Sequence, residues 1–241
     1  MCTRMLIFLE QAMKKLIKYF SKFEIALWLT SVLLITISFL IFDRTNHLTL
    51  VASVLGVTAI LLNAKGNPIG QGLMVIFSLI YGVISYGFAY YGEMITYIGM
   101  TMPMAVIALI AWLKNPFQGN KAEVKVNRIS KKETLFMVML TALVTVIFYF
   151  ILKHFGTANL IPSTLSVTTS FSAVYLTFRR SPYFSLLYAF NDIVLIILWS
   201  LASFYNLSYI SVLVCFVMFL INDLYAFISW RKLEIRQRIV D

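Results

Sequence analysis

The chain has 241 residues, of which 61% are hydrophobic and only 12% are charged. A soluble domain is about half apolar and about a quarter charged, so this chain has too little polar surface to coat a water-soluble globule. A net charge of +10 could indicate a nucleic-acid partner, but basic residues at membrane edges explain it without one. The long uncharged runs therefore predict an all-α polytopic membrane protein, and period-2 membrane strands are not seen.

The first 22 residues mix apolar positions with Lys14, Lys15, Lys18 and Lys22. A full-length apolar span follows them, whereas a cleaved signal peptide would end at a small-residue cleavage site. Residues 1–22 are therefore predicted to form a cytoplasmic basic amphipathic segment, with a helix over 5–22 lying on the inner membrane surface.

Eight transmembrane helices are predicted from the apolar runs that follow. They cover residues 24–42, 47–63, 70–91, 93–113, 133–152, 161–178, 183–204 and 207–230. Each is close to the ~20 residues that cross a ~30 Å hydrocarbon layer. With a cytoplasmic N-terminus, 18 of the 20 Lys and Arg residues fall on inner segments, and only Arg44 and Lys153 fall outside. The positive-inside rule thus predicts that both termini are cytoplasmic.

An internal repeat is predicted on either side of the inner loop 115–132. Each triplet of spans has an inner turn that ends in proline, "AKGNP" at Pro68 and "RRSP" at Pro182, and each closes with Trp112 or Trp230. The arrangement is 1 + (3 + 1 + 3): an extra helix 23–43, a repeat 47–114, an inverting linker helix 133–152, a second repeat 161–230 and a basic tail 231–241. Parallel repeats of this kind are typical of transporters, which hold the solute where the halves meet.

Two Asn-Asp pairs interrupt the last two spans. Tyr188, Asn191, Asp192 and Trp199 follow helical spacing and share one face. A carboxylate costs at least ~2.5–3.5 kcal/mol at the centre of a membrane helix on insertion scales, so a buried acid usually marks function. A packing hydrogen bond to a neighbouring helix is the alternative interpretation of Asp192.

The second pair, Asn222 and Asp223, reaches a similar depth in the last span. Both residues are candidate binding residues, and both could instead hold Asn191 in place. In the span 70–91, Gln71, Ser78 and Tyr81 form a second polar stripe, and the repeat overlay places Ser78 opposite Asp192. These two stripes are predicted to face each other.

A site lined by aromatic rings, amides and carboxylates suits a flat, hydrogen-bonding solute, whether neutral or cationic, and a cation over a ring gains roughly 0.5–2 kcal/mol. No Lys or Arg is predicted inside the membrane to bind a phosphate group. Cys2, Cys215, His47 and His154 lack metal-ligand spacing, so neither a metal nor a cofactor is predicted.

The chain resembles the PnuC family of bacterial vitamin transporters over about residues 47–232. The resemblance rests on Tyr91-Gly92-Glu93-Met94, Pro103, Trp112, "NDIVLIILW" and "NDLYAFISWRK". It implies a fold similar to the SWEET transporters in the inner membrane of a bacterial cell. An aromatic-x-x-Trp-x-x-Asn/Asp pattern marks the family's binding helix, and ending it on Asn191 places Ser185 and Tyr188 at the two aromatic positions.

The implied activity is uptake of nicotinamide riboside by facilitated diffusion, with trapping by a separate cytoplasmic kinase. Thiamine, riboflavin or a deoxynucleoside are alternative solutes, and proton coupling through Asp192 or Asp223 is an alternative mechanism. A membrane-embedded enzyme has little support, since no nucleophile–base pair is found. A non-transporting subunit is hinted at only by the extra first helix. The expected partners are a small-molecule solute, membrane lipid and, as a possibility, further copies of the chain.

Overall fold

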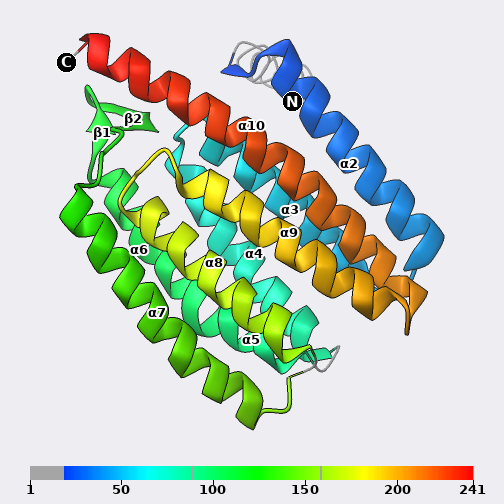
Figure 1. The fold of residues 1–241 in the computed structure, drawn as a ribbon. Coiled ribbons are helices and arrows are strands. Elements are labelled where there is room, and N and C mark those ends of the chain that lie inside the picture. Colours follow the sequence, from blue (N-terminus) through cyan, green and yellow to red (C-terminus); the bar gives the residue numbers. More distant parts are fainter. Residues whose placement is uncertain (1–18, 88–89, 158, 241) are drawn as a thin grey trace, which may run out of the picture.

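A computed structural model describes residues 19–87, 90–157 and 159–240. Most of this chain is helical (Figure 1). The first half contains α2 (Lys22–Phe42), α3 (His47–Ala64), α4 (Pro68–Gly87), α5 (Tyr91–Thr96), the π-helix η1 (Tyr97–Thr101) and α6 (Met102–Leu113). The second half contains α7 (Lys131–His154), α8 (Leu160–Phe178), α9 (Phe184–Ser203), the 3-10 helix η2 (Leu207–Tyr209) and α10 (Ile210–Val240). Most of the amphipathic helix predicted over 5–22 lies outside the described residues.

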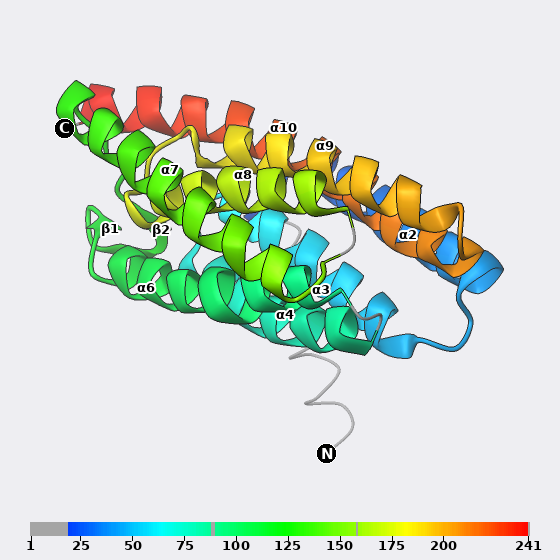
Figure 2. The ribbon, with the colours of Figure 1, turned by 60° about the horizontal axis from the view of Figure 1, so that its bottom comes forward.

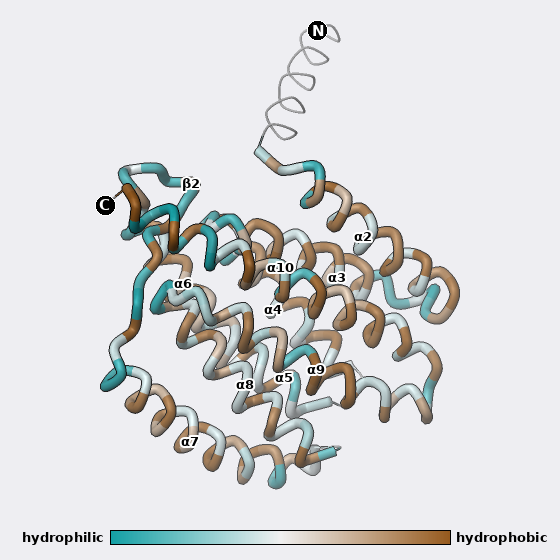
Figure 3. Tube along the Cα trace, turned by 45° about the horizontal axis from the view of Figure 1, so that its top comes forward, coloured by the Kyte–Doolittle hydropathy of each residue, from teal (hydrophilic) through white to brown (hydrophobic). Residues whose placement is uncertain are grey.

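The apolar helices confirm the prediction of an all-α membrane protein. Seven helical segments among the described residues are long and apolar enough to cross a membrane. The predicted span 161–178 corresponds to α8, which has 19 residues but is not among the seven. Eight of its residues are Ser or Thr, which lowers its hydropathy. Figure 3 shows hydrophobic residues along the helices and hydrophilic ones near β2 and the end of α10.

Six helical segments form a closed ring in the order α3, α4, α6, α8, α9 and α10, with α10 packing back on α3. α2 lies outside the ring against α3 and α10, and α7 lies outside it against α8 (Figures 1 and 2). The first helix of each triplet therefore packs on the last helix of the other triplet.

The turns after α3 and α8 have the same backbone conformation. Gly66 has a φ of 68° and Arg180 a φ of 57°, both in the left-handed region. The next residue donates its backbone N–H to an earlier carbonyl in each case, Asn67 to Leu62 at 3.0 Å and Ser181 to Leu176 at 2.9 Å. Glycine adopts this conformation without strain, whereas arginine does not.

Two buried tryptophans join the halves in the same reciprocal way. The Trp112 Nε1–H of α6 donates to the Thr177 carbonyl of α8 at 2.9 Å, and the Trp230 Nε1–H of α10 donates to the Asn63 carbonyl of α3 at 2.6 Å. Both acceptors lie one residue before the end of their helix, where carbonyls lack an intrahelical partner. The two indole rings meet with centroids 5.3 Å apart.

The segment from α5 to α6 is one continuous helix with a local widening. Met102 donates its backbone N–H to the Tyr97 carbonyl, which is the five-residue spacing of a π-helix. The next residue, Pro103, has no N–H, and its ring crowds the preceding turn. A π-bulge relieves that crowding, and such bulges are common at functional sites.

The connection between α6 and α7 is more structured than the predicted loop 115–132. It contains an antiparallel hairpin of β1 (Pro116–Phe117) and β2 (Asn120–Val124). The hairpin segment, residues 116–127, contacts the turns after α3 and α8. The backbone N–H of Val124 donates to the Gly66 carbonyl at 2.9 Å, and that of Asn127 donates to the Arg180 carbonyl at 3.0 Å. α10 also continues to Val240, so the basic residues after Trp230 are helical.

Close helix packing at Gly56 supports a stability test. A Cβ at Gly56 of α3 would lie 2.2 Å from Cζ of Phe219 on α10, which is itself buried among aromatic rings. We expect Gly56→Ala to destabilise the protein by about 1–3 kcal/mol through overpacking. Gly72→Ala is the matched control, because nothing lies within 4 Å of its Cβ position and Ala is the better helix former. Melting temperatures of the purified variants compare the two, and an equal shift would contradict the prediction.

Candidate functional site

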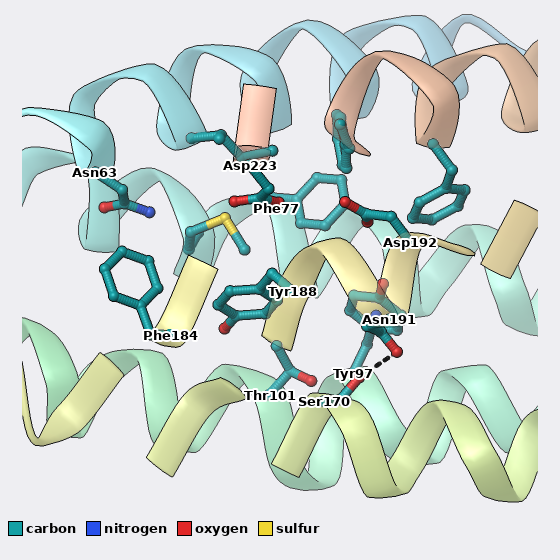
Figure 4. A pocket seen from close by; sticks show the side chains of 14 residues that line it. Asn63, Phe77, Tyr97, Thr101, Ser170, Phe184, Tyr188, Asn191, Asp192 and Asp223 are labelled. Carbon is teal, nitrogen blue, oxygen red and sulfur yellow. Dashed lines mark hydrogen bonds between the residues drawn. The ribbon is translucent and has the colours of Figure 1, made fainter. Parts of the chain in front are cut away.

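A cavity lies inside the ring, between the two triplets. Its lining comes from α3, α4, the η1 segment, α8, α9 and α10 (Figure 4). The residues are Ile60, Asn63, Met74, Phe77, Tyr97, Thr101, Ser170, Phe184, Tyr188, Asn191, Asp192, Phe216, Phe219 and Asp223. Four of the predicted residues thus share one cavity: Tyr188, Asn191, Asp192 and Asp223.

Two carboxyl groups provide the charge of this cavity. Asp192 of α9 is 3% exposed and Asp223 of α10 is 4% exposed. Figure 4 shows their carboxyl groups pointing toward one another across the space beside Phe77. The lining contains neither Lys nor Arg. Acidic groups without a basic partner in an apolar surrounding favour a cation between them.

Asn191 is held in one orientation by α8. Its Oδ1 accepts hydrogen bonds from Ser166 at 3.2 Å, Thr169 at 2.9 Å and Ser170 at 3.0 Å. A hydroxyl group can donate or accept, so the orientation rests on the structure, in which the amide oxygen is the atom beside all three hydroxyls. The oxygen therefore faces α8, which leaves the two N–H donors of the amide for the cavity side.

Aromatic rings close the cavity toward the hairpin end of the molecule. Phe184 lines the cavity and packs against Trp230 with ring centroids 4.9 Å apart and against Trp112 at 6.1 Å. Both tryptophans are fully buried and hydrogen-bonded to helix ends. This layer therefore has little freedom to move by side-chain rotation alone.

A second aromatic layer closes the opposite end. Phe77 stacks on Tyr81 at 5.5 Å, and Trp199 lies beyond Tyr81 with contacts to Tyr90 at 5.0 Å and Tyr209 at 5.5 Å. The space enclosed between the two layers is about 40 Å³. A buried water needs at least about 10–15 Å³ in this measure, whereas ligand pockets span about 300–1,000 Å³. The cavity must therefore widen before it can hold a nucleoside-sized solute.

Five predicted site residues do not line the cavity. Gln71 donates to the Asn63 side chain at 3.0 Å, and Ser78 bonds to its own helix at Met74. Tyr81 and Trp199 belong to the aromatic layer just described. Asn222 donates to Ser31 of α2 at 2.9 Å and so faces away from the cavity. The predicted polar stripe of α4 thus supports the site from behind rather than facing Asp192.

Several lining residues were missed by sequence reasoning. α4 presents Met74 and Phe77 to the cavity, and these stand 114 positions before Tyr188 and Asn191. The repeat overlay therefore pointed to Met74 and Phe77, but Ser78 was predicted instead because it is polar. Phe184 supplies an aromatic ring next to Ser185, where the family pattern has one. Asn63 and Ser170 give no such signal, because single polar residues in a helix are common.

The comparisons with known proteins agree with this architecture. The model of a family described as "Nicotinamide mononucleotide transporter" matches residues 46–232. This chain belongs to that family. The matched region begins just before α3, so α2 precedes it. No group of His, Cys, Asp and Glu that could hold a metal ion is found among the described residues.

Proteins named PnuC confirm the resemblance. A nicotinamide riboside transporter PnuC of Neisseria mucosa is 28% identical over 212 residues, covering 86% of this chain and 81% of the relative. A crystal structure of the vitamin B3 transporter PnuC matches with a TM-score of 0.78 and 27% identity, covering 90% of this chain and 94% of that one. The chain is thus a multi-pass membrane transporter of the PnuC type.

The hydroxyls that hold Asn191 can be tested without touching the cavity wall. Ser166 and Thr169 donate to Asn191 but do not line the cavity. We expect the double variant Ser166→Ala, Thr169→Val to weaken solute binding roughly tenfold, since it removes two hydrogen bonds of about 0.5–1.5 kcal/mol each. Thr164→Val is the control, because the Thr164 hydroxyl donates only to its own helix. Ligand titrations of the two variants would contradict the prediction if both bound as the native protein does.

Proposed function

We propose that this transporter takes up nicotinamide riboside, or a closely similar nucleoside-like vitamin, by facilitated diffusion through the cavity between its two halves. The observation that carries the proposal is the pairing of two carboxyls, Asp192 and Asp223, with aromatic rings in one enclosed cavity. A pyridinium cation can stack on the rings and neutralise the charge of one of the two acids. The Asn191 amide supplies donors for a carboxamide or ribose oxygen.

The same chemistry favours the riboside over the mononucleotide. The matching family is described by the mononucleotide, whereas the Neisseria relative is called a riboside transporter. A phosphate group adds negative charge and asks for Arg or Lys, or for backbone N–H groups at a helix start. The cavity lining has no basic residue and already holds two acids. Phosphate would therefore be repelled, and phosphorylation by a separate cytoplasmic kinase would trap the solute after entry.

The proposed orientation places the hairpin end in the cytoplasm with both chain termini. The connections at this end include Lys65, Lys114, Arg128, Arg179 and Arg180, whereas Arg44 and Lys153 lie toward the opposite end. This asymmetry fits the positive-inside rule. The ring of helices and the reciprocal tryptophan bonds support the parallel repeat, with an axis along the membrane normal. Transport then requires the two aromatic layers to open alternately.

Removing the charge of Asp192 tests the substrate class. Thermal-shift titration first asks whether nicotinamide riboside, thiamine, riboflavin or a nucleoside raises the melting temperature of the native protein. We expect Asp192→Asn to lower the affinity for nicotinamide riboside roughly tenfold to a hundredfold, since a hydrogen bond to a charged group contributes about 1.5–3 kcal/mol. The affinity of the same variant for the uncharged dihydro form of the riboside should fall at most about twofold.

A matched control for that test is Glu123→Gln, which removes a carboxylate from the hairpin and not from the cavity. It should leave both affinities unchanged. Equal losses for the charged and the uncharged riboside in Asp192→Asn would mean that Asp192 acts by packing. If only another vitamin raised the melting temperature of the native protein, that vitamin would be the solute, and the assignment to the family would be unaffected.

Proton coupling is a second candidate mechanism, and the facing carboxyls of Asp192 and Asp223 favour it. Two like charges this close in an apolar surrounding oppose each other, so a proton could take the place of the solute cation. Under facilitated diffusion, uptake into proteoliposomes should reach the same plateau with and without an imposed pH gradient. Accumulation above the external concentration, driven by inward proton flow and absent in Asp223→Asn, would establish coupling instead.

A further inference from the structure

The first helix, α2, is the counterpart of the linker helix α7. Both begin after a serine whose hydroxyl accepts a hydrogen bond from the backbone N–H of a glutamate three residues later, at 3.2 Å in each case. Each glutamate then forms an ion pair with the basic residue that directly follows the next helix. The corresponding residues are Ser21 and Ser130, Glu24 and Glu133, and Lys65 and Arg179. The described residues thus form two four-helix units, although α2 precedes the region matched by the family.

The two counterparts differ in what they join. α2 bonds to both halves: Glu24 pairs with Lys65 of the first half at 3.2 Å and accepts from Tyr225 of α10 at 2.8 Å. One helical turn or two further on, Asn222 of α10 donates to Ser31 of α2 at 2.9 Å. Glu24 is 3% exposed and Ser31 is 1% exposed, so these contacts are shielded from water. α2 therefore bridges the seam between α3 and α10.

The hydrogen bonds and ion pairs of α7, among the described residues, reach α8 alone. Thr141 bonds to Ser172 at 3.2 Å, and Thr145 bonds to Thr168 at 2.9 Å. Glu133 pairs with Arg179, which follows α8. Across the second seam, which lies between α8 and α6, α6 packs mainly on α4 and α8. α7 does meet the first half, but through apolar contacts: Leu152 lies against Gly92 of α5, and Met137 shares a hydrophobic cluster with Trp112 of α6. Among the described residues, α7 thus adds neither a hydrogen bond nor an ion pair across the α6–α8 seam.

We infer that α2 acts as a staple that holds the α3–α10 seam closed, so that the cytoplasmic mouth opens at the α6–α8 seam. The inference rests on the proposed transport cycle, in which the halves must separate at that end. Buried charge-assisted bonds resist separation more than contacts between apolar faces do. The α3–α10 seam then serves as the hinge, and Glu24 and Ser31 are positioning residues that never touch the solute.

The hairpin segment must move when the second seam opens. It bonds to the first half at Gly66 and to the second half at Arg180, through backbone groups. It also covers the cytoplasmic end of the tryptophan layer, because Val124 packs with Trp112 and Trp230. Opening at the α6–α8 seam therefore pulls on the hairpin segment and leaves α2 in place.

Spin labels at repeat-equivalent positions test the direction of opening. Ile69 of α4 and Ile228 of α10 lie on opposite sides of the stapled seam, and Tyr183 before α9 and Ile110 of α6 lie on opposite sides of the other seam. All four side chains are exposed. The labels are placed in full-length protein that lacks Cys2 and Cys215, and distances are measured by pulsed electron resonance with and without nicotinamide riboside. We expect one narrow distribution for Ile69–Ile228 that the riboside does not change. The Tyr183–Ile110 distribution should be broad without solute and should shift when the riboside is added.

Removing the staple provides the second arm. The double variant Glu24→Gln, Ser31→Ala should broaden the Ile69–Ile228 distance distribution and reduce uptake roughly tenfold. A loss of this size corresponds to weakening one charged and one neutral hydrogen bond. The same chemistry at the contact between α7 and α8, Glu133→Gln of α7 with Ser172→Ala of α8, should leave the Ile69–Ile228 distribution narrow. Melting temperatures show that each double variant is folded.

Three results would overturn the inference. They are larger movement at Ile69–Ile228 than at Tyr183–Ile110, equal broadening in both staple variants, or two narrow distributions in a protein that transports. A failure of the substrate assignment looks different. Nicotinamide riboside would then fail to raise the melting temperature of the native protein, while the distances sampled without solute would still distinguish the two seams.

Discussion

Two indole-to-carbonyl hydrogen bonds fix how the halves of this transporter sit against each other. An N–H in a hydrocarbon environment must find an acceptor, and the last carbonyls of a helix must find a donor. Trp112 and Trp230 satisfy both needs at once, each donating from the end of one half to the end of the other. Sliding of either half would leave the two buried indole N–H donors unpaired, although each carbonyl would keep the backbone N–H of Gly66 or Arg180. The cavity is therefore anchored beside the tryptophan pair through Phe184.

Polar groups inside the molecule are concentrated where helices face each other, and this explains the low hydropathy of α8. Five of its eight hydroxyl side chains either bond to α7 or hold the Asn191 amide, so these five do not face lipid. The exposed faces of α2 and α7 instead carry large apolar side chains such as Leu33, Phe136 and Phe150. A helix that would insert poorly alone is stable here because its neighbours satisfy its polar groups.

The symmetry of the fold extends beyond the triplets that carry the solute. A serine cap, a glutamate and a basic helix-end residue recur in α2 and α7. The halves nevertheless differ in chemistry at the cavity, since Asp192 and Asp223 both belong to the second half. They differ also at the seams, since α2 bonds to both halves through polar groups whereas α7 meets the first half through apolar contacts. A symmetric scaffold thus holds an asymmetric site, which is what a single solute of fixed charge requires.

The sequence by itself determined the class of protein, the helices and the family, because hydrophobic runs and motif spacing are local properties of a chain. It also predicted Tyr188, Asn191, Asp192 and Asp223, which the structure brings to one cavity; their part in binding stays a prediction. Only the tertiary structure decided that Asn222 turns to α2 while Asp223 turns inward. Adjacent residues on a helix point about 100° apart, so the packing of neighbours settles which one faces the cavity. Packing also places Asn63, near the end of α3, and Phe184, at the start of α9, in the cavity lining, because these helix ends lie where the halves meet.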